Sequence, residues 1–117
     1  FLYPCSESFD SEITNWLKMH NCEYATPVLY KIISNDIKEV IARNYDLICF
    51  FTPGGVKSLM ENFPGFKQNG TTIGAFGANT FKAAEEAGLI LQIKAPQPQA
   101  PSMVSALEIY LSSFKRK

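Results

Sequence analysis

The sequence predicts an α/β protein organised on parallel β-sheets. Two stretches carry this prediction, because in each a short apolar strand leads through a turn of small residues into a helical pattern. The first begins at Leu47, and the second begins about 25 residues later, at Thr72. Alternation of strand and helix at this spacing is typical of parallel sheets, whose strands are apolar because helices cover both faces.

The segment before these stretches predicts one helix between two extended regions. Phe1 to Cys5 suits the end of a strand, and a polar turn containing Ser6 leads into a helix with Asn21 as its left-handed cap. Tyr24 to Ser34 is an extended stretch longer than a usual strand, which suits a connection between two domains. The residues that recur at helical spacing through the helix are Phe9, Ile13, Trp16, Leu17 and His20.

The strand Leu47 to Phe51 is expected at the centre of its sheet, since its apolar run suits burial on both faces. A short helix over residues 37–41 precedes it. Thr52 follows as the N-cap of the next helix, and Pro53 takes the first helical position, where an N–H would lack a partner in any case. This helix ends before Pro64-Gly65.

The second strand, Thr72 to Phe76, is followed by a turn from Gly77 to Thr80 and by a helix from Phe81 to Ala87, which Gly88 stops. Leu89 to Ile93 predicts a further strand. An extended connection rich in proline then leads into the last helix. Its inward-facing residues are expected to be Val104, Leu107, Leu111 and Phe114.

Both glycine-containing turns predict a site for anions. Amides at a helix N-terminus lack partners inside the helix, and the positive end of the helix dipole strengthens their attraction for carboxylate or phosphate. Open α/β sheets bind ligands at the carboxyl ends of their strands, which is where both turns fall. The expected binding residues are Thr52, Pro53, Gly54 and Gly55 in the first turn, Gly77, Ala78, Asn79 and Thr80 in the second, and Ser6 in a third polar turn.

The composition is that of a soluble globular protein. The 117 residues are 46% hydrophobic and 19% charged, and the 11 basic side chains equal the 11 acidic ones, so no net field favours nucleic acid or an anionic membrane. No apolar run approaches the ~20 residues that span a bilayer, and a cytoplasmic location is expected. The chain begins without Met inside a strand-like run, which indicates part of a longer protein.

The sequence lacks the motifs of several enzyme classes. The single histidine, His20, has no nucleophile turn at a spacing that would indicate a catalytic triad. Neither a Walker-type phosphate loop nor a complete dinucleotide fingerprint occurs. Cys5, Cys22 and Cys49 lack metal-ligand spacing and are expected to be reduced structural thiols. We therefore expect no metal and no cofactor, and catalysis, if any, by binding and shaping a reactive substrate.

Five short segments follow the order of motifs in a known enzyme family. Phe50-Phe51-Thr52-Pro53-Gly54-Gly55 is similar to a Phe-Ser-Pro-Ser-Gly turn, and Ile73 to Thr80 is similar to an Ala-Ile-Gly-Pro-Thr-Thr turn, with Ala78 and Asn79 in place of the usual Pro and Thr. Together the segments resemble uroporphyrinogen-III synthases across nearly the whole chain. The other three segments are Leu2 to Cys5, Val28 to Tyr30 and Ala95 to Pro98.

The resemblance implies two flavodoxin-like α/β domains, of which this chain is a part. Residues 1–28 would end the second, visited domain, residues 29–34 would form the interdomain connector strand, and residues 35–117 would form the main part of the first, returning domain. The implied substrate is hydroxymethylbilane, a linear tetrapyrrole with carboxylate side chains, held in the cleft between the domains. The implied protein is a monomer when full length.

The resemblance also implies a lyase reaction in haem biosynthesis, which closes the bilane to uroporphyrinogen III with inversion of ring D and loss of water. Tyr30 is the phenol placed to assist departure of the hydroxyl group, and a packing role for it is the alternative. Two other functions stay open. One is a non-catalytic synthase-like module that has kept the anion sites, and the other is an unrelated flavodoxin-like domain that binds a phosphorylated ligand.

Overall fold

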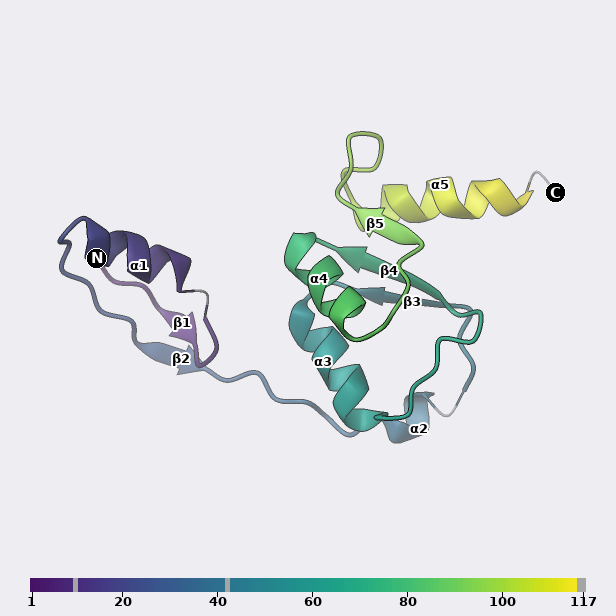
Figure 1. The fold of residues 1–117 in the computed structure, drawn as a ribbon, viewed down its shortest axis with the longest axis horizontal. Coiled ribbons are helices and arrows are strands. Elements are labelled where there is room, and N and C mark those ends of the chain that lie inside the picture. The colour runs from purple at the N-terminus through teal and green to yellow at the C-terminus, as the bar shows by residue number, and fades with distance from the viewer. Residues whose placement is uncertain (10, 42, 116–117) are drawn as a thin grey trace. The chain divides into compact units, whose positions relative to one another are not determined.

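The structure, a computed structural model, describes residues 1–9, 11–41 and 43–115. Strands and helices alternate along the chain (Figure 1). They fall into two compact units, Phe1–Ser34 and Asn35–Lys117. The strands within each sheet pair in parallel, which confirms the predicted α/β class.

The unit Phe1–Ser34 is a strand-helix-strand motif. β1 (Cys5–Ser6) pairs in parallel with β2 (Val28–Tyr30), and α1 (Glu12–Met19) connects them. Asn21 follows the helix in a left-handed conformation with φ of 53°, which confirms its predicted role as a cap.

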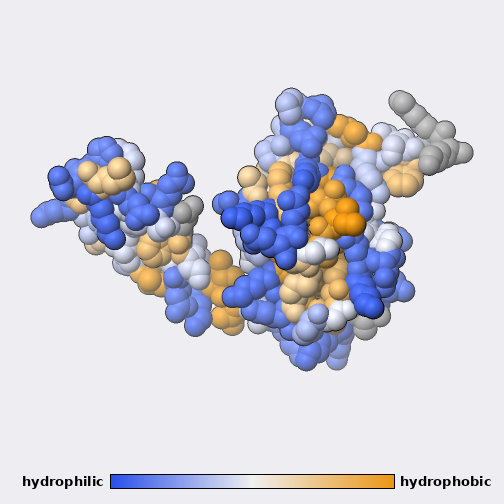
Figure 2. All heavy atoms as spheres, in the orientation of Figure 1, coloured by the Kyte–Doolittle hydropathy of each residue, from blue (hydrophilic) through white to orange (hydrophobic). Residues whose placement is uncertain are grey.

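Pairing and packing in this unit are limited. Within residues 24–34 the strand β2 covers three residues, and its partner β1 has two. In α1 the buried residues are Thr14 and Leu17, whereas Ile13 and Trp16 are 49% and 54% exposed. A sheet of two short strands covers only a narrow stripe of a helix, so part of the apolar face stays open. Hydrophobic residues also lie at the surface over β2 (Figure 2).

The unit Asn35–Lys117 is a parallel sheet with helices on both faces. Its strands are β3 (Leu47–Phe50), β4 (Thr72–Phe76) and β5 (Ile93–Ala95), in the spatial order β3-β4-β5. Its helices are α2 (Lys38–Ile41), α3 (Pro53–Asn62), α4 (Ala78–Glu86) and α5 (Met103–Lys115).

Alternate side chains of these strands enter two separate hydrophobic cores, as the two-residue period of a strand requires. On one face, the strands pack against α3 and α4, and the buried members of that core are Phe50, Val56, Leu59, Ile73, Ala84 and Leu89. On the other face, α5 covers the sheet, and the buried members there are Ile93, Ala95, Ala100, Met103 and Ala106. The two cores therefore bury both faces of β4.

The expected order of the strands was wrong. β3 lies at the edge of the described sheet and β4 lies at its centre, with Ile73 and Ala75 fully buried at 0% exposure. β4 has hydrogen-bonded neighbours on both sides, whereas β3 pairs with β4 alone among the described strands. The apolar run of β3 predicted coverage of its faces, and it carried no information on how many neighbours the strand has.

The third strand begins later than expected, at Ile93 and not at Leu89. Gly88 takes a left-handed φ of 81°, and Leu89 turns into the core beside α3 and α4 before any pairing starts. The side-chain amide of Gln68 then bonds both backbone groups of Ile90, each at 2.9 Å, and this holds the segment outside the ladder.

The inward face of α5 was predicted one residue out of phase. Val104, Leu111 and Phe114 are 67%, 51% and 56% exposed, and of the expected set only Leu107 packs on the core, at its margin. The face turned to the sheet carries Met103, Ala106, Leu107 and Tyr110. The Tyr110 hydroxyl is 2.8 Å from the Thr72 hydroxyl, a polar contact that helps to fix this rotation of the helix.

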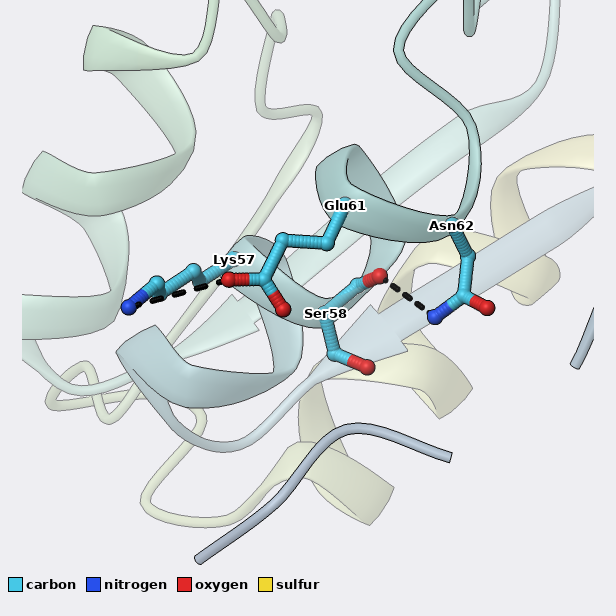
Figure 3. A network of polar contacts seen from close by, with 4 residues as sticks. All are labelled: Lys57, Ser58, Glu61 and Asn62. Carbon is cyan, nitrogen blue, oxygen red and sulfur yellow. Dashed lines mark hydrogen bonds and ion pairs between the residues drawn. The ribbon is translucent and has the colours of Figure 1, made fainter. Parts of the chain in front are cut away.

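Side-chain contacts stabilise the second half of α3 (Figure 3). Lys57 Nζ lies 3.7 Å from Glu61 Oε1, an exposed pair of the kind that adds a few tenths of a kcal/mol to a helix. Asn62 Nδ2 donates to the Ser58 carbonyl at 2.9 Å, and Asn62 Oδ1 accepts from the Ile37 N–H at 3.2 Å. Asn62 therefore ties the segment before α2 to the end of α3.

All three cysteines in the described part of the chain are free thiols, as expected. Cys5 is buried, and Cys22 and Cys49 are half-buried. Burial raises the pKa of the Cys49 thiol, which favours the neutral and less nucleophilic form. This environment suits a packing role.

Packing at Gly74 leads to a test of the fold. A Cβ atom there would lie 3.3 Å from Cys49 Sγ and 3.4 Å from Ile93 Cβ, whereas one at Gly65 would have nothing within 4 Å. Gly74→Val should lower the free energy of unfolding by about 1–3 kcal/mol, because the core has no room for the side chain. Gly65→Ala, the control, should change it by less than about 0.5 kcal/mol. Urea unfolding measures both, and equal effects would contradict the described packing.

Candidate functional site

In the unit Asn35–Lys117, the N-termini of two helices lie at the carboxyl ends of neighbouring strands. The parallel register pairs Leu47 with Thr72 and continues to Phe50 with Ala75, so β3 and β4 end side by side. α3 starts three residues after the last residue of β3, and α4 starts two residues after that of β4. The predicted juxtaposition of the two glycine turns is therefore found in the structure (Figure 1).

In the first turn, Thr52 caps α3 as predicted. Its backbone is extended, with φ of −144° and ψ of 153°, and its hydroxyl accepts a hydrogen bond from the Gly55 N–H at 3.1 Å. The Thr52 carbonyl accepts from the same N–H, also at 3.1 Å. The Gly55 amide is thus already bonded, contrary to expectation, and Pro53 has no N–H. The Gly54 amide has no partner among the described residues, and it is the donor that this turn presents.

In the second turn, Gly77 is required by the backbone itself. Its φ of 89° lies in the region that favours glycine, and its N–H donates to the Ala95 carbonyl at 2.8 Å, which ties the turn to β5. No side chain caps α4 within the described structure, and the amides of Ala78, Asn79 and Thr80 have no partners among the described residues. Thr80 is buried, with 2% of the residue exposed, so it offers little surface to a ligand.

Electrostatics at both turns favour an anion. The first turns of α3 and α4 consist of uncharged residues, so the positive ends of both helix dipoles stay uncompensated there. The helices are 10 and 9 residues long, enough for the dipole of each to develop. Two such ends on neighbouring strands can hold two carboxylates of one ligand.

An apolar hollow lies at the same carboxyl ends of the strands, and it was not predicted from the sequence. Its volume is about 430 Å³. Phe51 and Phe76, at the ends of β3 and β4, stack with ring centroids 6.3 Å apart and form one wall. The first turns of α5 form the other wall with Met103, Val104 and Leu107, and Cys49 and Ser102 complete the lining. The sequence pattern placed Phe51 inside the buried strand, whereas the structure ends β3 at Phe50 and leaves Phe51 60% exposed.

Two other predicted site residues, Ser6 and Tyr30, belong to the unit Phe1–Ser34 and not to the unit of the glycine turns. The Ser6 side chain is buried, and its hydroxyl donates to the Ser8 carbonyl at 2.7 Å, so it serves its own turn. Tyr30 lies on β2 with 59% of its surface exposed. Its phenol is therefore open to solvent.

No group of three or more His, Cys, Asp or Glu side chains in residues 1–9, 11–41 and 43–115 is placed to hold a metal ion. No helix in that part of the chain combines the length and the apolar character that crossing a bilayer requires.

Comparison with known proteins identifies a family. The sequence profile of the family described as uroporphyrinogen-III synthase HemD matches residues 1–105. Curated proteins and solved structures give no match. The matched range contains both glycine turns, the whole of the unit Phe1–Ser34 and every residue that lines the apolar hollow except Leu107.

Proposed function

The chain belongs to the uroporphyrinogen-III synthase family, and from this premise we propose that it closes hydroxymethylbilane to uroporphyrinogen III with inversion of ring D and loss of water. The family acts in haem biosynthesis, and its reaction is that of a lyase. The proposed substrate is a linear chain of four pyrrole rings that carry carboxylate side chains. Its recognition requires donors for carboxylates beside an apolar surface for the rings.

The proposal is supported by amide donors and an apolar hollow that lie together at the carboxyl ends of the strands. The Gly54 amide and the amides of Ala78, Asn79 and Thr80 are donors without partners among the described residues. The hollow of about 430 Å³ beside Phe51 and Phe76 offers an apolar surface for a pyrrole ring. A carboxylate that accepts an amide hydrogen bond gains about 1.5–3 kcal/mol, so several such bonds can fix the conformation of a flexible chain.

The proposed mechanism is control of conformation. In the family's reaction the bilane loses its hydroxyl group to give an electrophilic azafulvene. Ring D attacks this azafulvene through its own substituted carbon to give a spiro intermediate, and rearrangement then gives the macrocycle with ring D inverted. Unaided, the bilane closes to the other isomer. The residues of the two turns have side chains that do not titrate. Their contribution is therefore to hold the carboxylates so that ring D meets the reactive carbon, which is catalysis by orientation.

The proposal keeps the other expectations from the sequence. Residues 1–28 would end one α/β domain, residues 29–34 would form the connector strand, and residues 35–117 would form the main part of the other domain. The full-length protein would act as a cytoplasmic monomer. Ala78 stands where the family pattern has Pro, so we propose that Asn79 and Thr80 supply the amides that matter in the second turn.

The direct test supplies the chain with freshly formed hydroxymethylbilane and separates the product isomers after oxidation. We expect an excess of the type III isomer over a control without protein, because the bound bilane is folded before it can close unaided. A product identical to that of the control would contradict the proposal. Binding of the bilane without a change of product would instead indicate a non-catalytic module.

The amide hypothesis is tested at a single position. Gly54→Pro deletes the N–H, whereas Gly54→Ala keeps it and places a Cβ in ordinary contact with Thr52 Oγ1 at 3.7 Å. We expect kcat/KM to fall by about tenfold or more in Gly54→Pro, which is the loss of one bond to a charged group. Gly54→Ala and Thr52→Ala should have modest effects. Thermal unfolding checks that each variant folds, and equal losses in well-folded Gly54 variants would refute the role of the amide.

The role proposed for Tyr30 is to assist the departing hydroxyl group, since its phenol is exposed and can donate a proton. Tyr30→Phe removes the hydroxyl and keeps the ring, and we expect kcat to fall by about tenfold or more. Tyr24→Phe is the matched control, because Tyr24 is half-buried in the same segment. Unchanged turnover in Tyr30→Phe would assign this side chain to packing.

A further inference from the structure

A second and larger hollow lies at the amino ends of the strands in the same sheet. Its volume is about 690 Å³, within the range of roughly 300–1,000 Å³ that small-molecule sites occupy. The segment that leads into β3 and the loop between α3 and β4 enclose it, at the amino ends of the strands. Its lining includes Arg43, Tyr45, Phe63, Phe66 and Lys67.

Hydrogen bonds within the chain hold the walls of this hollow in place. The Thr71 hydroxyl donates to the Tyr45 carbonyl at 2.9 Å, and the Thr72 N–H donates to the Asp46 carbonyl at 2.8 Å, which joins the two walls. Gln68 Nε2 donates to the Thr71 carbonyl at 3.0 Å. Asn62, shown in Figure 3, is bonded at both ends of its amide. These polar groups shape the hollow, and their own bonding needs are met by the chain.

The basic side chains of the lining, unlike its polar groups, are not bonded to other described residues. Arg43 and Lys67 take part in none of the four ion pairs formed by the described residues. Asp46 is the single acidic residue of the lining, so the hollow has a formal charge of +1. A guanidinium group offers a carboxylate two parallel N–H donors, and an ammonium group adds a point charge. The charged groups therefore favour an anion.

The remaining lining favours a flat ring. Phe63 and Phe66 are half-buried against the α3 and α4 core, and Tyr45 is 39% exposed. Aromatic faces and edges attract another ring in stacked or edge-on contact. We propose that this hollow is a second ligand site, separate from the glycine turns, that binds a small aromatic carboxylate with its ring on Phe63 and Phe66 and its carboxylate on Arg43 and Lys67.

The test titrates the ¹⁵N-labelled chain with benzene-1,3-dicarboxylate and follows the backbone amides by NMR. We expect saturable shifts at Gly65 and Gly70, which line the hollow, and smaller shifts at Gly54 and Gly77 in the glycine turns. Cyclohexane-1,3-dicarboxylate has the same charge without the aromatic ring, and benzamide has the ring without the charge. Both should bind at least about tenfold more weakly. Equal affinity for all three compounds, or shifts confined to the glycine turns, would overturn the proposal.

Three variants assign the contacts. Arg43→Gln and Lys67→Gln should each weaken binding of the dicarboxylate by about tenfold, the loss of one charge-assisted bond. Lys57→Gln is the control, since Lys57 is an exposed residue of α3 that pairs with Glu61 and does not line the hollow. Retention of full affinity in both Arg43→Gln and Lys67→Gln, or an equal loss in Lys57→Gln, would overturn the assignment.

Discussion

The parallel ladder between β3 and β4 is the interaction on which the rest of the larger unit depends. It pairs four residues of each strand, from Leu47 with Thr72 to Phe50 with Ala75, and so brings both strands to an end at one edge. The two turns and their helices follow at once, which places α3 and α4 side by side over one core. A shift of the register would separate the two turns, and with them the Gly54 and Asn79 amides that we assign to the substrate.

Local signals explain what could be predicted from the sequence. The Thr52 cap and the left-handed residues Asn21 and Gly88 each depend on a few neighbouring residues, and the structure contains all of them. The strand β4 was predicted with its observed bounds, because an apolar run between polar and glycine residues has few alternatives. The neighbouring position of the two glycine turns followed from these local elements and from the general geometry of parallel sheets.

Features that depend on neighbours distant in sequence could not be predicted. The edge position of β3 depends on which strands pair with it, and its own residues do not record this. The rotation of α5 depends on the fit of Met103 against Gly74 and on the contact of Tyr110 with Thr72, whereas the sequence offered a larger apolar stripe one residue away. The hollow beside Phe51 and Phe76 needs residues from β3, β4 and α5 together, so no single stretch of sequence predicts it.

The proposed function requires the two glycine turns to bind carboxylates of one tetrapyrrole together. The most direct measurement is an NMR titration of the ¹⁵N-labelled chain with uroporphyrin III, a macrocycle with the carboxylate side chains of the proposed product. We expect the amides of Gly54 and Asn79 to shift together, with one shared Kd, while the already bonded Gly55 amide shifts less. Shifts at only one turn, or two different Kd values for the two turns, would contradict this requirement.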